Sequence, residues 1–247
     1  MHLLLRDGAP LPAPEAITQD TDGAMALAEL YAFPREATWV RAMMNTTVDG
    51  AVTGADGTSG SLRNPDDSLV FGVLRALADV VLVGASTVRS EDYRRPQGRA
   101  DLLSPSRRPG GGRRPALAVW SSSGELPSTL EADWPTFLIA PAQVAGAAGR
   151  LAGIPAAQVI AASTAAEAVS ALAERGYRGI QAEGGPASLA RLAAEGLLDE
   201  LCFSVTHRSV GGPSPRVING AAHDLTWQLS SLITGEHATI SRYLRAG

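Results

Sequence analysis

The chain has 247 residues, of which 45% are hydrophobic and 19% are charged, and these proportions are ordinary for one large or two small globular domains. Its formal net charge of −4 argues against a general attraction to nucleic acid or anionic membrane. Every basic residue is an arginine, which excludes a Schiff-base lysine and the lysine of a P-loop. The single cysteine and the four histidines lack metal-ligand spacing, so no metal site is expected. Because no apolar run reaches membrane-spanning length and no leader-like segment begins the chain, we expect a cytoplasmic protein.

Two regions are predicted, an N-terminal arm over residues 1–36 and a single domain over residues 37–247. The arm is rich in proline, alanine and acidic residues, with one short helix near 23–31. The domain begins with a strand over 38–45, a turn and a glycine-containing loop. Asn64 then has the features of a helix cap, since Pro65 suits the first helical position and two acids follow. This helix is expected to end near residue 77.

Strands and helices alternate in the rest of the chain. The apolar run 79–84 is typical of a strand buried on both faces. An arginine-rich segment over 94–114 predicts a long mobile loop with mostly solvated side chains. Further strands are expected at 116–120, 136–140, 158–162, 178–182 and 200–206, with helices at 164–175 and 186–195 and a closing antiparallel hairpin over 225–233 and 238–244. The alternation favours a three-layer α/β domain with a mostly parallel sheet.

The segment 178–189 reads as a strand, a two-glycine turn and a helix start. Gly184 and Gly185 let a ligand approach the backbone closely, and the helix start offers free N–H groups. Pro186 occupies the first helical position, where its missing N–H costs nothing. We therefore expect this turn to bind a phosphate, with the carboxylate of Glu183 at the entrance to the same site. An ordinary strand-to-helix turn with a surface glutamate is the alternative.

Other strand ends carry small or polar residues as well. Asn45 and Thr46 lie at the end of the first domain strand, the segment 84–87 follows the second, and Ser122 follows a third. In parallel sheets, ligands bind beyond the carboxyl ends of the strands. Together these ends favour an extended phosphate-bearing ligand such as a dinucleotide, although the G-x-G-x-x-G fingerprint of a standard dinucleotide-binding domain is absent.

Three blocks of the sequence resemble the riboflavin-biosynthesis pyrimidine reductases, whose fold is that of dihydrofolate reductase. The segment 46–50, Thr-Thr-Val-Asp-Gly, is similar to the family's Ser-Leu-Asp-Gly. The segment 74–89 looks like its central strand and turn, and Glu183-Gly-Gly-Pro186 with 196–201 looks like its most specific block. The blocks occur in order over about residues 38–218. The resemblance implies a dihydrofolate-reductase-like α/β domain with antiparallel C-terminal strands.

The resemblance also implies an activity, a cofactor and a set of site residues. The family transfers a hydride from NADPH to a pyrimidine that carries a ribosylamino phosphate, and the sugar becomes a ribityl chain. By this resemblance, the catalytic residues are Asp49 and Glu183, and those that bind substrate are Ser59, Arg75, Arg95, Arg99 and Glu183. Those implied to bind NADPH are Asn45, Thr46, Asp49, Val83, Gly84, Ala85, Ser86, Thr87, Glu91, Ser122, Gly184, Gly185, Pro186, Ala187 and Ser188.

Several departures from the family leave alternatives open. The run 90–93 replaces the family's two aspartates and proline, and an aromatic residue common near Ser61 is absent. A diverged reductase of dihydrofolate, a pterin or another heterocycle is therefore a second hypothesis, and a non-catalytic nucleotide-binding module is a third. The zinc motif of the deaminase half found in bifunctional relatives is absent. The resemblance further implies a homodimer.

Overall fold

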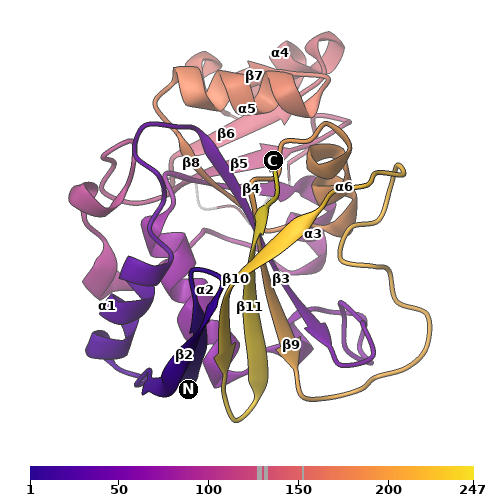
Figure 1. Ribbon diagram of the computed structural model, residues 1–247. Coiled ribbons are helices and arrows are strands. Elements are labelled where there is room, and N and C mark those ends of the chain that lie inside the picture. The colour runs from indigo at the N-terminus through magenta and orange to yellow at the C-terminus, as the bar shows by residue number, and fades with distance from the viewer. Residues whose placement is uncertain (127–129, 131–132, 152) are drawn as a thin grey trace.

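A computed structural model describes residues 1–126, 130, 133–151 and 153–247. Within these residues a single eleven-stranded sheet has the order β2-β1-β10-β11-β9-β3-β8-β4-β5-β6-β7 (Figure 1). The strands are β1 His2–Arg6, β2 Ala9–Ala16, β3 Trp39–Thr47, β4 Val80–Gly84, β5 Ala116–Trp120, β6 Thr136–Ala140, β7 Val159–Ala161, β8 Gly179–Ala182, β9 Glu200–Thr206, β10 Trp227–Thr234 and β11 Ala238–Arg245.

Seven of the described strands are mutually parallel, from β9 through β3 and β8 to β7. The apolar strands β4, β5 and β6 are buried at every position, as expected for a sheet covered on both faces. β11 and β10 add antiparallel strands beside β9, and β1 and β2 extend that edge. The predicted α/β class is therefore confirmed, with a mostly parallel sheet and antiparallel C-terminal strands.

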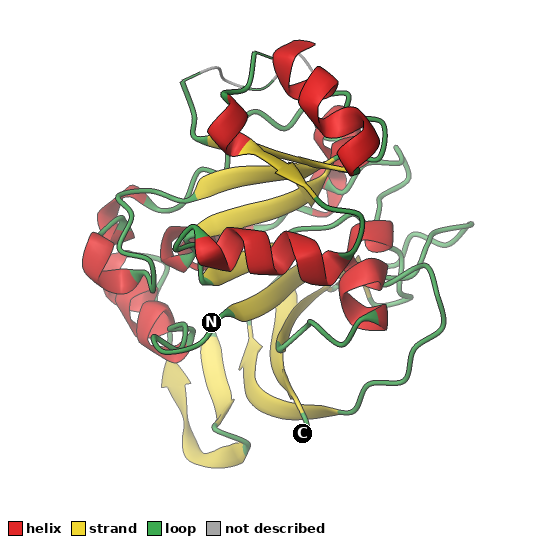
Figure 2. Ribbon diagram, turned by 90° about the horizontal axis from the view of Figure 1, so that it is seen from above, coloured by secondary structure: helices red, strands yellow, loops and turns green. Residues whose placement is uncertain are grey.

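Helices cover both faces of this sheet (Figure 2). The helices are α1 Thr21–Leu30, α2 Pro65–Leu77, α3 Ala85–Ser90, α4 Ala142–Leu151, α5 Ala165–Glu174 and α6 Pro186–Ala194, with 3-10 turns at Gly60–Leu62, Ala100–Leu102, Pro105–Arg107 and Ala156–Gln158. The apolar sides of α5 and α6 share one core with the even-numbered residues of β3, β4 and β5. α1 to α4 pack on the opposite face. None of the helices in the described part of the chain is long and apolar enough to cross a membrane.

The N-terminal segment, expected as an arm with one helix, also contributes two strands to the sheet. A buried ion cluster attaches its end to the body of the domain. Glu200, which is fully buried, accepts hydrogen bonds from the guanidinium groups of Arg41 and Arg242. These two arginines also donate to the carbonyls of Tyr31 and Leu30. Burial raises the pKa of Glu200, but the charges on the two arginines outweigh it and bring the pKa to about 2.

The arginine-rich segment 94–114 is anchored to the body of the domain, and Arg108 is an exception to the expectation that most of its arginines are solvated. That side chain is buried and donates to the carbonyl of Gly112 at 2.5 Å. Nearby, the carboxylate of Asp79 accepts N–H groups from Gly110 and Gly179, which ties the segment to the start of β8. These contacts join residues that are distant in sequence, so local composition did not reveal them.

Candidate active site

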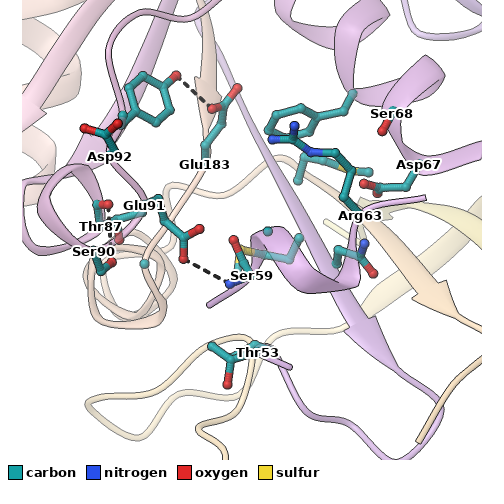
Figure 3. A pocket seen from close by; sticks show the side chains of 18 of the residues that line it. Thr53, Ser59, Arg63, Asp67, Ser68, Thr87, Ser90, Glu91, Asp92 and Glu183 are labelled. Carbon is teal, nitrogen blue, oxygen red and sulfur yellow. Dashed lines mark hydrogen bonds between the residues drawn. The ribbon is translucent and has the colours of Figure 1, made fainter. Parts of the chain in front are cut away.

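A polar pocket of about 650 Å³ lies at the carboxyl ends of β3 and β8 (Figure 3). One wall is the exposed side of α2, and the opposite wall comes from α3 and the loop that follows it. The loop over 52–60 contributes a third side, and the two-glycine turn after β8 contributes the fourth. The location matches the expectation that a ligand binds beyond the carboxyl ends of parallel strands.

An arginine, a glutamate and a tyrosine form a closed network in the pocket. Arg75 Nε and Nη2 donate to the two carboxylate oxygens of Glu183, each at 2.7 Å. The hydroxyl of Tyr93 donates to Glu183 Oε2 at 3.0 Å, and Arg75 Nη2 lies 3.2 Å from the same hydroxyl. The Arg75 guanidinium also lies over the ring of Phe71, 4.2 Å from its centroid. The two-point ion pair fixes Glu183 in one orientation.

The charges in this network are set by burial and by the ion pair. Burial raises the pKa of Tyr93 well above its usual value, and the adjacent Glu183 carboxylate raises it further. Burial alone would lower the pKa of Arg75, but Glu183 more than compensates and the pKa lies above its ordinary value. At neutral pH Tyr93 is therefore a neutral phenol and Arg75 a cation. The network offers a ligand a fixed cation with polar hydrogen-bonding groups beside it.

The two turns that precede α3 and α6 pack directly against each other. The N–H of Gly84 donates to the carbonyl of Gly184 at 2.8 Å. A Cβ at Gly84 would meet Ser188 Oγ at 2.6 Å, and one at Gly185 would meet Thr87 Oγ1 at 2.7 Å. Gly184 has φ +94°, a conformation that side chains rarely adopt. The positive φ at Gly184 therefore favours glycine, whereas a side chain at Gly84 or Gly185 would displace the hydroxyl of Ser188 or Thr87.

Glu91 and Asp49, two acidic residues that the resemblance implies as site residues, fix neighbouring loops through hydrogen bonds. Glu91 Oε1 accepts the backbone N–H of Ser59 at 3.0 Å, and this contact connects α3 to the loop that closes the pocket (Figure 3). The carboxylate of Asp49 accepts the hydroxyl of Thr47 and the N–H groups of Val210 and Gly211, the latter at 2.7 Å. Its pKa is lowered by the Thr47 hydroxyl and by these backbone groups. Asp49 lies outside the residues that line the pocket, and its catalytic role stays a prediction.

The structure brings many of the predicted residues together and leaves others apart. Those that line the pocket are Asn45, Ser59, Arg75, Thr87, Glu91, Arg95, Glu183, Gly185 and Pro186. Those that do not line it are Thr46, Asp49, Val83, Gly84, Ala85, Ser86, Arg99, Ser122, Gly184, Ala187 and Ser188. Gly84, Gly184 and Ser188 belong to the packed turns behind the pocket wall. Arg99 is paired with Asp101, whereas Arg95 is at the pocket and stacks near the ring of Trp134.

Several residues of the pocket were not predicted as site residues, among them Arg63, Asp67, Phe71 and Tyr93. In the sequence, Tyr93 is part of the run 90–93 that departs from the family pattern, and Asp67 is one of the two acids that follow Pro65. A tyrosine placed on the segment after α3 could have suggested a partner for Glu183. The local sequence does not distinguish Asp67 from its neighbour Asp66, because the two differ only in the distant residues that the fold places beside them. In the part of the chain that is described, no group of three or more His, Cys, Asp or Glu side chains could hold a metal ion.

The sheet topology defines an α/β protein with a pocket at the carboxyl ends of its parallel strands. The RibD C-terminal domain model matches residues 38–240. The chain therefore belongs to the RibD C-terminal domain family, and the resemblance to the riboflavin-biosynthesis pyrimidine reductases is confirmed.

Solved structures with the same fold are distant in sequence. A pyrimidine reductase-like protein from Corynebacterium diphtheriae has a TM-score of 0.75 and 23% identity, over 90% of this chain and 98% of that one. The deaminase/reductase of Thermotoga maritima has a TM-score of 0.65 and 16% identity, over 85% of this chain and 57% of that one. The riboflavin biosynthesis reductase Rib7 of Saccharomyces cerevisiae has a TM-score of 0.58 and 13% identity, over 85% of this chain and 90% of that one. A search of curated proteins finds no match.

Proposed function

We propose that the protein reduces the ribosyl group of a phosphoribosylamino pyrimidine, of the 5-amino-6-(5-phosphoribosylamino)uracil type, with NADPH as the hydride donor. The observation that carries this proposal is the Arg75–Glu183–Tyr93 network directly beside the glycine turn of α6. Family membership supports the reaction class, and the Thermotoga maritima neighbour bears the name of the same reductase. The pocket is large enough for two ligand parts to meet, since sites for small molecules have volumes of about 300–1,000 Å³.

The proposed NADPH site consists of the two packed turns and the hydroxyl groups near them. Gly185 and Pro186 line the pocket where α6 begins, and the first-turn N–H groups of that nine-residue helix suit a phosphate. Thr87 and Ser90 add hydroxyl donors from α3. The close approach of Thr87 Oγ1 to Gly185 keeps the α3 hydroxyl beside the start of α6. The cofactor, when bound, supplies a hydride; the protein groups bind and orient.

The reaction adds a hydride to the sugar carbon attached to nitrogen and breaks the bond between that carbon and the ring oxygen. The ring oxygen must then gain a proton to become a hydroxyl. We assign the orientation of the sugar to Glu183, and this role is supported by its contacts with Arg75 and Tyr93 and by its position directly before the glycine turn. Arg95 at the pocket edge is the proposed partner of the substrate phosphate, because a guanidinium fork matches phosphate geometry.

Reduced-nicotinamide absorbance tests the proposal with the purified chain, NADPH and the phosphoribosylamino pyrimidine. Loss of absorbance only when protein and both ligands are present is the expected result. Glu183→Gln should abolish this loss, whereas Glu174→Gln, an exposed acid on α5, should not. Replacing NADPH by NADH tests the cofactor preference. NADPH binding without oxidation by any pyrimidine would instead support a binding module. We also propose a homodimer, and a monomer by sedimentation at micromolar concentration would contradict it.

A further inference from the structure

A long loop joins β9 to β10 and reaches the pocket. It spans residues 207–226, all of which the structure describes, and it contains no helix or strand. Figure 1 shows it running from the end of β9 to the vicinity of α6. Pro215, near its middle, lines the pocket. Because no ladder of backbone hydrogen bonds fixes this β9–β10 loop, its position depends on a few contacts with neighbouring segments.

Hydrogen bonds join the β9–β10 loop to two sides of the pocket. Ser214 Oγ accepts the N–H of Val52, which lines the pocket at the start of the loop over 52–60, at 3.0 Å. The N–H of Asn219 donates to the carbonyl of Pro186, the first residue of α6, at 3.2 Å. Between positions 214 and 219, the β9–β10 loop therefore bridges the 52–60 side of the pocket and the proposed NADPH turn.

Asp49 holds the beginning of the β9–β10 loop. Its carboxylate accepts the N–H of Gly211 at 2.7 Å and that of Val210 at 3.1 Å. Such charge-assisted hydrogen bonds are stronger than neutral ones. The stretch that they restrain is conformationally permissive, since Gly211 and Gly212 have φ values of +69° and +73°. Loss of the Asp49 carboxylate would therefore give this part of the loop many more conformations.

Asp49 itself lies away from the pocket. It is exposed, it does not belong to the residues that line the pocket, and its oxygens accept the Thr47 hydroxyl and the loop N–H groups. We propose that Asp49 is a positioning residue: by fixing the β9–β10 loop against the 52–60 side and the start of α6, it sets the affinity of the pocket for both ligands. The identity of the two ligands rests on the proposed function.

Asp49→Asn tests the inference in steady-state kinetics, because asparagine keeps the size of the side chain and removes its charge. The KM values for NADPH and for the pyrimidine should each rise about tenfold or more, while kcat changes less than about threefold. Ser214→Ala, which removes the next contact of the loop, should act in the same direction. Its effect should be smaller when it is added to Asp49→Asn, since both changes release the same loop. Asp22→Asn, an exposed acid in the first turn of α1, is the matched control and should leave all values unchanged.

Limited digestion with trypsin reports on the β9–β10 loop directly and needs no turnover. Arg216 is exposed in this loop, and the peptide bond after it becomes cleavable when the loop detaches from the domain. NADPH should slow cleavage at this bond in the unaltered chain. Asp49→Asn should accelerate the cleavage about tenfold or more, with the site identified by mass spectrometry, and Asp22→Asn should not change it.

The two assays separate this inference from the proposed reaction. A fall in kcat of about 100-fold or more, with unchanged KM and unchanged cleavage, would make Asp49 a catalytic residue and overturn the inference. Unchanged kinetics, or faster cleavage without any change in KM, would overturn it too, because the loop would then not set ligand affinity. Faster cleavage and weaker NADPH binding in Asp49→Asn, in a chain that reduces no pyrimidine, would overturn the reaction and support the positioning role.

Discussion

Replacing Asp67 by asparagine should stabilise the folded protein at neutral and alkaline pH. The pKa of this carboxyl is about 6 in the folded chain and 3.8 in the reference state. Each pKa unit corresponds to about 1.4 kcal/mol, so ionising Asp67 in its buried position costs on the order of 3 kcal/mol. Asparagine has the same shape and no charge, and it avoids that cost.

The sign of the pH dependence follows from the raised pKa. The folded chain binds the Asp67 proton more tightly than the unfolded chain does. The cost is therefore absent below about pH 3.8, grows as the pH rises toward 6, and is complete above it. We expect Asp67→Asn to raise the melting temperature by about 5 °C or more at pH 8 and to leave it nearly unchanged at pH 4.

Thermal unfolding followed by circular dichroism at pH 8 and pH 4 measures this effect. The control Asp22→Asn alters an exposed acid and should change the free energy of unfolding by no more than about 0.5 kcal/mol. A variant Asp67→Asn that is no more stable than the unaltered chain at pH 8 would refute the reasoning. A gain of equal size at both pH values would refute it too, because it would not come from ionisation.

Three other predictions concern the glycine turn, the network and the buried ion cluster. Glu183→Gln should reduce kcat at least about 100-fold in steady-state kinetics and leave the NADPH affinity, measured by fluorescence titration, within about twofold of the original. An unchanged kcat would contradict the proposed role of Glu183 in orienting the sugar. Gly184→Ala should weaken NADPH binding about tenfold or more, because the backbone there has φ +94° and the new Cβ would lie 3.3 Å from Met44 Sδ, and normal affinity in the same titration would oppose this. Glu200→Gln should cost about 3–5 kcal/mol in urea unfolding, since it leaves two buried arginines without their anion. In the unaltered chain, the lowered pKa of Glu200 means that its contribution is present above pH 4.5 and is lost as the pH falls toward 2; stability independent of pH there would argue against it.

Local signals in the sequence were sufficient for the elements that frame the site. Asn64 caps α2 through its side chain, and Thr164 and Glu167 form the expected capping box. Pro186 begins α6 directly after the two glycines. In each case the determinant is a side chain within a few positions of the backbone group that it satisfies. The same locality explains why the parallel core strands, which are continuous apolar runs, were placed correctly.

The parts that escaped prediction depend on partners far away in the chain. The strand β1 pairs with β10, whose residues lie more than two hundred positions later, and β2 joins the sheet by pairing with β1. The helix α4 contains two glycines within ten residues, and glycine has a low helix propensity. Arg41 finds Glu200 across 159 positions, and no local pattern marks either residue as buried. Asp66 and Asp67 look alike in the sequence and differ only in what the folded chain places beside them.

Glu183 directly precedes the glycine turn, and this arrangement has a consequence for the free energy of ligand binding. The N–H of Glu183 donates to the carbonyl of Leu82, and one peptide unit later the carbonyl of Gly184 accepts from Gly84. Arg75 holds the carboxylate as well, so the turn and Glu183 are both fixed by protein contacts before any ligand binds. Little conformational freedom is left to lose on binding, and a larger share of each ligand's contact energy therefore appears as affinity.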